Sequence, residues 1–272
     1  MRDIKTNVVW KHLETSKKKI IIEQGGSRSG KTYNILMWIV FGYCLRNKNK
    51  IVSVCRKTFP ALRTSALRDF LEILKNYELY KEEDHNKTSS EYKLNGNLIE
   101  FISLDSPQKV RGRKRDILFL NEANECTWED WNQLVFRTVD RIILDYNPSD
   151  EFHWIYDKVK TREDADFFKT TYKNNKFLEE SIVKEIERLQ YTDENYWRIY
   201  GLGEIGQSKS TIFDFREIET IPENAKFISM GMDFGYTNDP SVLCKIYLHD
   251  TNIYCEELFY RTGMTNRDIH NE

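Results

Sequence analysis

The sequence predicts an α/β fold: a P-loop nucleoside triphosphatase with a mostly parallel central sheet. Two observations support this prediction. Short apolar runs typical of buried strands alternate with helical segments from Lys18 to Tyr200, an alternation typical of parallel sheets that carry helices on both faces. In addition, Gly25–Thr32 matches GxxxxGK[ST] in full, with a strand-like run before it and a long apolar helix after it.

The first half of the chain supplies the opening strands in order. Lys18–Gln24 is a β-branched run that stops at two glycines, and Thr32–Leu45 has the composition of a long apolar helix. Lys50–Cys55 predicts a second strand, and Leu62–Tyr77 has apolar residues at helical spacing. Glu91–Leu104 contains an Asn-Gly pair between two strand-like runs, which predicts a β-hairpin.

The later elements suggest a boundary. Asp116–Leu120 and Arg141–Tyr146 predict two further strands, Trp128–Arg137 lies between them with a helical pattern, and Phe177–Tyr200 predicts two helices. Three glycines in Gly201–Lys209 mark the expected boundary. We therefore expect an ATPase domain at 1–208, with a helical lid at about 177–208, and the start of a β-rich unit at 209–272. Its strands are predicted at Lys226–Asp233, Ser241–Leu248 and Ile253–Tyr260.

Composition limits the possible classes of protein. Hydrophobic residues make up 40% and aromatic residues 13% of the 272 residues, enough for a large core. The net charge of −2 gives no overall signature of nucleic-acid binding, although a local basic patch remains possible. Five scattered cysteines without a CxxC pair predict reduced thiols in a cytosol. There is no signal-peptide pattern, and the longest apolar run, Ile35–Leu45, is shorter than the roughly 18 residues of a membrane span.

The glycine-rich loop predicts a site for ATP and Mg²⁺. Its glycines let successive backbone N–H groups point at phosphates, and the following helix directs its positive end at the same anion. Lys31 places a charge near the β- and γ-phosphates, and the hydroxyl of Thr32 can ligate Mg²⁺. A chance glycine turn is the alternative that both flanks argue against. The predicted nucleotide-binding residues of this loop are Gly25, Gly26, Ser27, Arg28, Ser29, Gly30, Lys31 and Thr32.

A second nucleotide motif follows the strand Asp116–Leu120. ATPases of the additional-strand type end such a strand in an acid for the Mg²⁺ shell and a glutamate that activates water. Here the pair is Asn121 and Glu122, so the first position has an amide without charge. We predict Glu122 as the general base. The alternative is a solvent-exposed acid at the end of a strand.

Three other positions have a structural and a functional interpretation. Asn147, at the end of the strand Arg141–Tyr146, could sense the γ-phosphate or simply open a turn before Pro148. The run 110–115 contains Arg111 and could be a solvated basic loop, an arginine finger or a DNA contact. Asp233 ends a later strand, where a single carboxylate is more often a turn cap than a metal ligand.

Taken together, these segments resemble the large terminase subunit of tailed bacteriophages. The resemblance rests on their order along the chain: GGSRSGKT, CRKTFPALRTSALRDF, VRGRKRDILFLNEANE, LDYNPSDEFHW, RIYGLGEIG and GMDFGYTNDPSV. It implies an N-terminal ATPase of the additional-strand type that packages double-stranded DNA, followed by a nuclease domain of the ribonuclease H-like fold. It also implies a ring docked on a portal protein, a small terminase subunit as partner, and a place in the host cytoplasm.

The resemblance also assigns roles to particular residues. It matches Lys31 and Thr32 to Walker A, Asn121 and Glu122 to Walker B, Asn147 to the coupling motif, Arg111 to a finger reaching the neighbouring subunit's ATP, and Asp233 to the first Mg²⁺ or Mn²⁺ ligand of the nuclease. Asn121 departs from the more common Asp, and no later nuclease carboxylates occur before Glu272, so we expect an incomplete nuclease site and suspect a truncated chain.

Two other functions stay open from the sequence. The first is another nucleic-acid-dependent ATPase, such as a helicase or translocase without nuclease activity. The second is a phosphotransferase or a nucleotide-gated interaction module. The lid of a kinase often carries several arginines, whereas Phe177–Tyr200 contains only Arg188 and Arg198.

Overall fold

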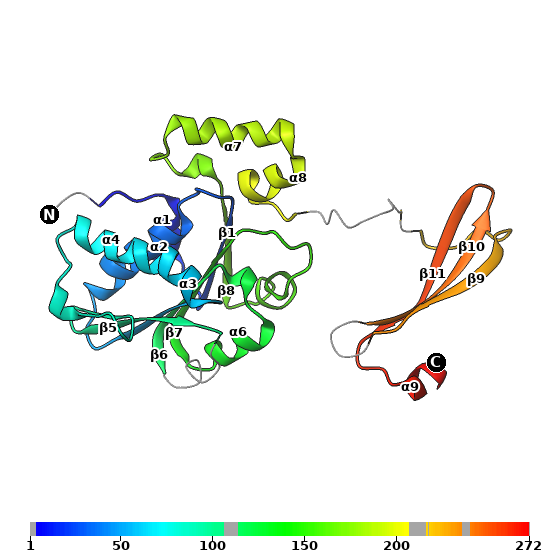
Figure 1. Cartoon of the computed structure of the whole chain (residues 1–272), viewed down its shortest axis with the longest axis horizontal. Helices are drawn as coiled ribbons and strands as arrows, with labels where there is room; N and C mark the ends of the chain where they lie inside the picture. The colour runs from blue at the N-terminus through cyan, green and yellow to red at the C-terminus, as the bar shows by residue number, and fades with distance from the viewer. Residues whose placement is uncertain (1–3, 106–113, 207–215, 217, 236–239, 272) are drawn as a thin grey trace. The chain divides into compact units, whose positions relative to one another are not determined.

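The chain forms two compact units, Met1–Lys209 and Ser210–Glu272. The computed structural model describes residues 4–105, 114–206, 216, 218–235 and 240–271 of them. Each unit has its own sheet, shown in Figure 1.

The first unit is built on a mostly parallel sheet, as the sequence predicted. Among the described residues its strand order is β3-β4-β5-β2-β6-β7-β1-β8. All neighbours from β5 to β8 pair parallel, whereas β3 and β4 extend one edge antiparallel. The strands are β1 (Ile20–Gly25), β2 (Ile51–Arg56), β3 (His85–Asn86), β4 (Glu91–Leu94), β5 (Asn97–Ser103), β6 (Arg115–Asn121), β7 (Thr138–Tyr146) and β8 (Ala165–Thr170).

The position of β7 decides the type of fold. It lies between β1, which leads into the glycine-rich loop, and β6, which ends in Asn121. This inserted strand is the one for which additional-strand ATPases are named. The carboxyl ends of β1, β6 and β7 therefore meet at one edge of the sheet, where open α/β sheets bind ligands.

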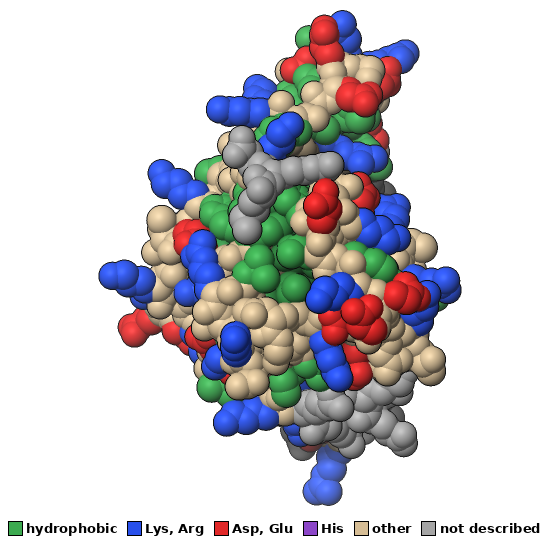
Figure 2. Space-filling view, turned by 90° about the vertical axis from the view of Figure 1, so that its left-hand side faces the viewer, with side chains coloured by type: hydrophobic (Ala, Val, Ile, Leu, Met, Phe, Trp, Pro, Cys, Tyr) green, Lys and Arg blue, Asp and Glu red, His purple; other side chains and the backbone are tan. Residues whose placement is uncertain are grey.

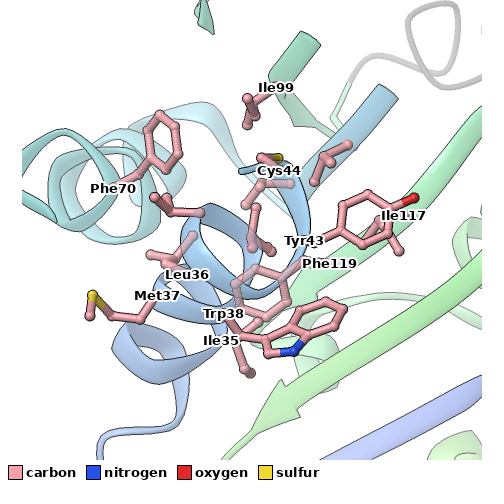
Figure 3. Close-up of a cluster of buried hydrophobic side chains, with 14 of the residues drawn as sticks. Ile35, Leu36, Met37, Trp38, Tyr43, Cys44, Phe70, Ile99, Ile117 and Phe119 are labelled. Atoms are coloured by element: carbon pink, nitrogen blue, oxygen red, sulfur yellow. The ribbon is translucent and has the colours of Figure 1, made fainter. Parts of the chain in front are cut away.

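Helices cover both faces of this sheet, and each strand alternates between the two cores. On β1, Ile21 packs on one face and Ile20 and Ile22 pack on the other. The first face is covered by α1 (Val8–Thr15), α2 (Lys31–Met37) and α4 (Arg68–Asn76), whose packing Figure 3 shows in part. The second is covered by α6 (Trp128–Val135) and the π-helical segment Ile155–Val159. Each fully buried aliphatic side chain stabilises the fold by about 1.5–3 kcal/mol.

Both long helices that the sequence predicts in the first half are present, but neither is α-helical throughout. Helix α2 continues without a break into the π-helical segment Trp38–Cys44. The second predicted helix begins earlier, with α3 (Phe59–Leu62), passes through the π-helical segment Arg63–Leu67, and continues as α4. Apolar periodicity predicts a helix but does not distinguish the α pitch from the π pitch.

The hairpin predicted from the Asn-Gly pair is confirmed as β4 and β5. Asn95 has φ 53° and Gly96 has φ 80°, the two positive values of a type I′ turn. Leu94 pairs with Asn97 across the turn.

The segment expected as a helical lid also contains the predicted helices. They are α7 (Glu180–Thr192) and α8 (Glu194–Tyr196), followed by the π-helical segment Trp197–Leu202. Their small core consists of Tyr172, Ile186 and Trp197. Short 3-10 turns lie at Glu82–Asp84, Ala123–Glu125 and Tyr172–Asn174.

The second unit is a three-stranded antiparallel sheet among the described residues, in the order β11-β10-β9. Its elements are β9 (Lys226–Asp233), β10 (Ser241–His249), β11 (Asn252–Arg261) and the helix α9 (Asn266–Asn271). The three predicted strands are confirmed, and their membership of a ribonuclease H-like fold stays a prediction. In the described ranges, no helix has both the length and the apolar composition to cross a membrane.

Candidate nucleotide-binding site

The glycine-rich loop joins strand β1 to helix α2, the two flanking elements that the sequence predicts. Gly30 caps α2 with φ 83°, a left-handed value that glycine adopts without strain. The Lys31 side chain folds back across the loop and is only 7% exposed. Its ammonium group donates to the carbonyl oxygens of Gly25 at 2.9 Å and Gly26 at 3.0 Å, and to Oδ1 of Asn147 at 2.9 Å. Burial lowers the pKa of Lys31, and attraction to nearby carboxylates opposes that shift.

A fully buried carboxylate, Asp145 on β7, joins the predicted motifs. One of its oxygens, Oδ1, accepts from Nδ2 of Asn121 at 2.9 Å and from the backbone N–H of Glu122 at 2.9 Å. The other, Oδ2, accepts from the hydroxyl of Thr32. Burial raises the pKa of Asp145, while these hydrogen bonds and the charge of Lys31 oppose the rise. The Walker A and Walker B residues are therefore connected through this carboxylate.

Glu122 has the environment expected of a general base. It lies just past β6 in a left-handed conformation, with φ 50° and ψ 58°. Burial, followed by repulsion from Asp145, raises its pKa to about 7. A carboxylate with a pKa near neutrality is a better proton acceptor than an ordinary one and is still largely ionised at slightly alkaline pH.

Arg56 and Glu125 form an ion pair beside this site. The guanidinium Nη2 of Arg56 lies 2.7 Å from Oε1 of Glu125, and its Nη1 donates to the hydroxyl of Ser65 at 2.9 Å. Its hydrogen bond to Glu125 raises the pKa of Arg56. Arg56 thus already has protein partners for its guanidinium, so phosphate binding by this side chain would require it to leave them.

Distant segments hold the loop from outside. Nδ2 of Asn7, the N-cap of α1, donates to the carbonyl of Ser29 at 2.9 Å. From the other side, Nδ2 of Asn175 donates to the carbonyl of Arg28 at 2.9 Å. The backbone N–H of Ser27 donates to the carbonyl of Tyr200 at 2.7 Å. The helical region after β8 therefore touches the loop directly.

The structure brings most of the predicted site residues together. The loop Gly25–Thr32, Asn121, Glu122 and Asn147 lie at the shared edge of β1, β6 and β7. Arg111 lies outside the described residues. Asp233 is exposed at the end of β9 in the second unit. Across the residues that the structure describes, no group of three or more His, Cys, Asp or Glu side chains could hold a metal ion.

Asp145 is the site residue that the sequence reasoning missed. It lies two positions before Asn147, within an apolar run that predicts a strand and nothing more. An acid inside a run of buried residues is the signal that could have found it, because an ionisable side chain is rarely buried without a partner.

Comparison with known proteins identifies the family. A family model described as phage terminase large subunit matches residues 17–204. The chain belongs to the phage terminase large subunit family. The large terminase subunit of the PBSX phage of Bacillus subtilis (strain 168) is 23% identical over an alignment 280 residues long, gaps included, which covers 89% of this chain and 64% of that protein. The large terminase subunit of Bacillus phage SPP1 is 25% identical over an alignment 260 residues long, which covers 85% of this chain and 61% of that protein.

Solved structures agree with the terminase fold. The large terminase of a thermophilic bacteriophage has a TM-score of 0.65 at 20% identity, covering 98% of this chain and 73% of that one. A further structure of the same protein, in complex with ADP, has a TM-score of 0.62. At this identity the likeness shows the fold alone. The chain spans less than two thirds of the two curated terminases that it matches.

Proposed function

We propose that this terminase chain binds ATP with Mg²⁺ and hydrolyses it, and that the whole protein uses this reaction to move double-stranded DNA into a procapsid. The observation that carries the proposal is the convergence of Lys31, Thr32 and Glu122 on one edge of the sheet. Family membership and the ADP complex of the thermophilic phage terminase support it.

The residues present fit a magnesium nucleotide. The hydroxyl of Thr32 is a hard oxygen ligand of the kind that Mg²⁺ prefers, and the carboxylate of Asp145 beside it supplies negative charge. When bound, the ion would neutralise charge on the phosphates. The loop N–H groups and Lys31 would bind the phosphate oxygens.

Two side chains, Glu122 and Lys31, act in the proposed hydrolysis step. Glu122 takes a proton from the attacking water as the water oxygen bonds to the γ-phosphorus, and the bond from that phosphorus to the ADP oxygen breaks. The ammonium of Lys31 has three hydrogens, which already have acceptors in the carbonyl oxygens of Gly25 and Gly26 and in Oδ1 of Asn147. To donate to a phosphate, Lys31 would therefore give up its bond to Asn147. Nucleotide binding would therefore free Asn147, which is the role expected of a coupling residue.

The DNA part of the proposal rests on the family. On the face that Figure 2 shows, Lys and Arg side chains are spread among acidic ones and around a hydrophobic area, so no single basic patch marks a DNA track there. We propose that the DNA-gripping surface is completed when several copies form a ring on the portal protein, with the small terminase subunit as partner in the host cytoplasm. Arg111 would then reach the neighbouring subunit's ATP.

The second unit fits the start of a nuclease. We propose that β9, β10 and β11 begin a ribonuclease H-like domain in which Asp233 is the first Mg²⁺ or Mn²⁺ ligand. In the full-length protein, Asp233→Asn should abolish Mn²⁺-dependent DNA cleavage and leave ATP hydrolysis intact. Cleavage at an unchanged rate would refute this assignment.

The central test is the ATP hydrolysis rate with and without double-stranded DNA. Glu122→Gln should lower the rate by roughly 10²–10⁴-fold, the usual contribution of a general base. Glu129→Gln is the matched control, because Glu129 is exposed on α6 and only a few residues away. Lys31→Ala should abolish nucleotide binding. Unchanged turnover in a folded Glu122→Gln protein would refute the assignment of the base, and turnover that ignores DNA in the full-length protein would argue against a motor.

A further inference from the structure

The site departs from a standard P-loop ATPase where the magnesium acid is expected. The end of β6 supplies Asn121, whose amide has no charge to attract a cation. Mg²⁺ in phosphate-binding sites is usually held by one or two carboxylates as well as the phosphates. If no residue other than Asn121 contributed here, the hydroxyl of Thr32 would be the protein's only ligand to the Mg²⁺ ion.

A carboxylate lies one strand away at the same level. In the parallel pairing of β6 and β7, Asn121 is the direct partner of Asp145. Side chains of directly paired residues project from the same face of a sheet. Nδ2 of Asn121 accordingly donates to Oδ1 of Asp145 at 2.9 Å. The acid is therefore displaced laterally by one strand and is not missing from the site.

The contact with Thr32 gives this carboxylate a specific task. A threonine hydroxyl has one hydrogen to donate and lone pairs with which to accept. To ligate a cation it must present a lone pair, so its hydrogen needs an acceptor elsewhere. Oδ2 of Asp145 is that acceptor. The carboxylate is fully buried, so water screens its charge only weakly. The ammonium group of Lys31 is attracted to the same carboxylate.

We propose that Asp145 replaces the absent Walker B acid: it orients the Thr32 hydroxyl and supplies the negative charge that holds Mg²⁺ on the bound nucleotide. This proposal rests on the ATP site proposed above. Asp145 is a positioning residue, since it acts through Thr32 and the metal shell. The amide of Asn121 donates a hydrogen bond that holds this carboxylate in place.

A purely structural role for Asp145 makes a different prediction. Its oxygen Oδ1 also accepts from the backbone N–H of Glu122 at 2.9 Å, so it stabilises the turn after β6. An asparagine has the same shape and keeps one oxygen for that N–H. Asp145→Asn should therefore preserve the fold in either role. Only the proposed role predicts that loss of the charge weakens Mg²⁺-dependent nucleotide binding.

The experiment measures how nucleotide binding depends on Mg²⁺. Binding of a fluorescent ADP analogue, mant-ADP, is titrated at fixed protein concentration, first with EDTA and then with increasing Mg²⁺. Asp145→Asn should raise the half-saturating Mg²⁺ concentration by about 10–100-fold, the effect typical of losing a residue that supports a metal ligand. Its affinity for mant-ADP in EDTA should stay within about twofold of the wild-type value. A general packing change at the site would instead alter both this affinity and the half-saturating Mg²⁺ concentration. Electron paramagnetic resonance of Mn²⁺ with ADP should show the same loss as a larger free Mn²⁺ signal.

Two further variants make the test decisive. Asp150→Asn makes the same chemical change at an exposed position shortly after β7 and should leave the Mg²⁺ dependence unchanged. The double exchange Asn121→Asp with Asp145→Asn moves the charge to the end of β6 and should restore most of the Mg²⁺ affinity, because the two side chains are direct partners.

The outcomes separate this proposal from the proposed function. Wild-type protein that binds no nucleotide with or without Mg²⁺ overturns both. Wild-type protein with Mg²⁺-dependent binding, together with a folded Asp145→Asn variant of unchanged Mg²⁺ dependence, overturns only the role of Asp145. If the single variant does not fold, a folded double exchange that lacks Mg²⁺-dependent binding overturns it.

Discussion

Gly203 offers a direct test of how tightly the region after α8 packs on the glycine-rich loop. It ends the π-helical segment Trp197–Leu202 with φ 65°. A Cβ at this position would lie 2.7 Å from Cα of Gly25 and 2.7 Å from the backbone nitrogen of Gly26. These atoms are backbone, so a substitution cannot be accommodated by turning a side chain. Gly203→Ala must displace the loop or the segment that carries Gly203.

The expected loss of stability is the sum of two effects. A residue with a Cβ in the left-handed region costs about 1–2 kcal/mol, and forcing extra volume into a packed site costs about 1–3 kcal/mol. Gly203→Ala should therefore lower the free energy of unfolding by about 2–5 kcal/mol. Gly96→Ala is the matched control, because Gly96 has φ 80° and its Cβ would meet only Oδ1 of Asn49, at 3.9 Å. That variant should lose about 1–2 kcal/mol.

Urea unfolding followed by tryptophan fluorescence isolates the relevant unit. All six tryptophans of the chain lie within Met1–Lys209, so their emission reports on that unit. Gly203→Ala should also weaken mant-ADP binding under conditions where the protein is folded, whereas Gly96→Ala should not. Equal losses of stability in the two variants, with equal nucleotide affinity, would refute the argument that Gly203 is required by its contact with the loop.

Three further predictions test the core, a buried hydrogen-bond hub and the thiols. Trp131→Ala on α6 removes a side chain that is 1% exposed and should lower the free energy of unfolding by about 3–5 kcal/mol. Phe136→Ala, just past that helix and 82% exposed, should change it by less than about 0.5 kcal/mol. Similar urea midpoints for the two variants would contradict the assigned core. Asn97→Ala should lower the free energy of unfolding by about 2–3 kcal/mol, because its buried amide donates to the carbonyls of three other residues. An unchanged free energy of unfolding would mean that those carbonyls find other partners. In native protein at pH 8, a thiol reagent monitored by mass spectrometry should label exposed Cys255 within minutes, and Cys255→Ser should remove that fast phase. Burial raises the pKa of Cys44 and Cys55 to about 12 and raises that of Cys126 as well, so fast labelling of these three thiols in the native protein would contradict their burial.

Most of the first unit could be predicted because its strands are apolar and its turns have distinctive sequences. The run at β1, the Asn-Gly pair and the P-loop each correspond to the predicted element. Helix α1 and strand β8 were not predicted. Only Val9 and Leu13 of α1 are buried, so the helix has a weak apolar stripe. Strand β8 is an edge strand of mostly half-buried residues and pairs only with β1 in the described part of the sheet, so it lacks the apolar run of a central strand.

The candidate site could be predicted only as far as its residues lie in local motifs. Sequence motifs predict Lys31 and Glu122 as site residues, because each motif is defined by its immediate neighbours. The role of Asp145 depends on which strand lies beside β6, and strand order is set by packing across the whole sheet. No local pattern states that Asn121 and Asp145 are paired. In the proposed role of Asp145, the charge that the motif after β6 lacks comes from the neighbouring strand.

The same geometry bears on Asn147, for which the sequence left two interpretations open. Its backbone directly follows β7 and precedes Pro148, whose ring fixes the turn, while its side-chain oxygen accepts from Lys31 at 2.9 Å. A turn residue and a phosphate sensor are thus compatible, because the turn is what aims the amide at the ammonium. The charge of Lys31 is attracted by the carboxylates of Asp145 and Glu122, so its departure toward phosphate would remove positive charge from beside both of them. A divalent cation arriving with the phosphates would restore positive charge there, which agrees with a buried acid beside Asn121.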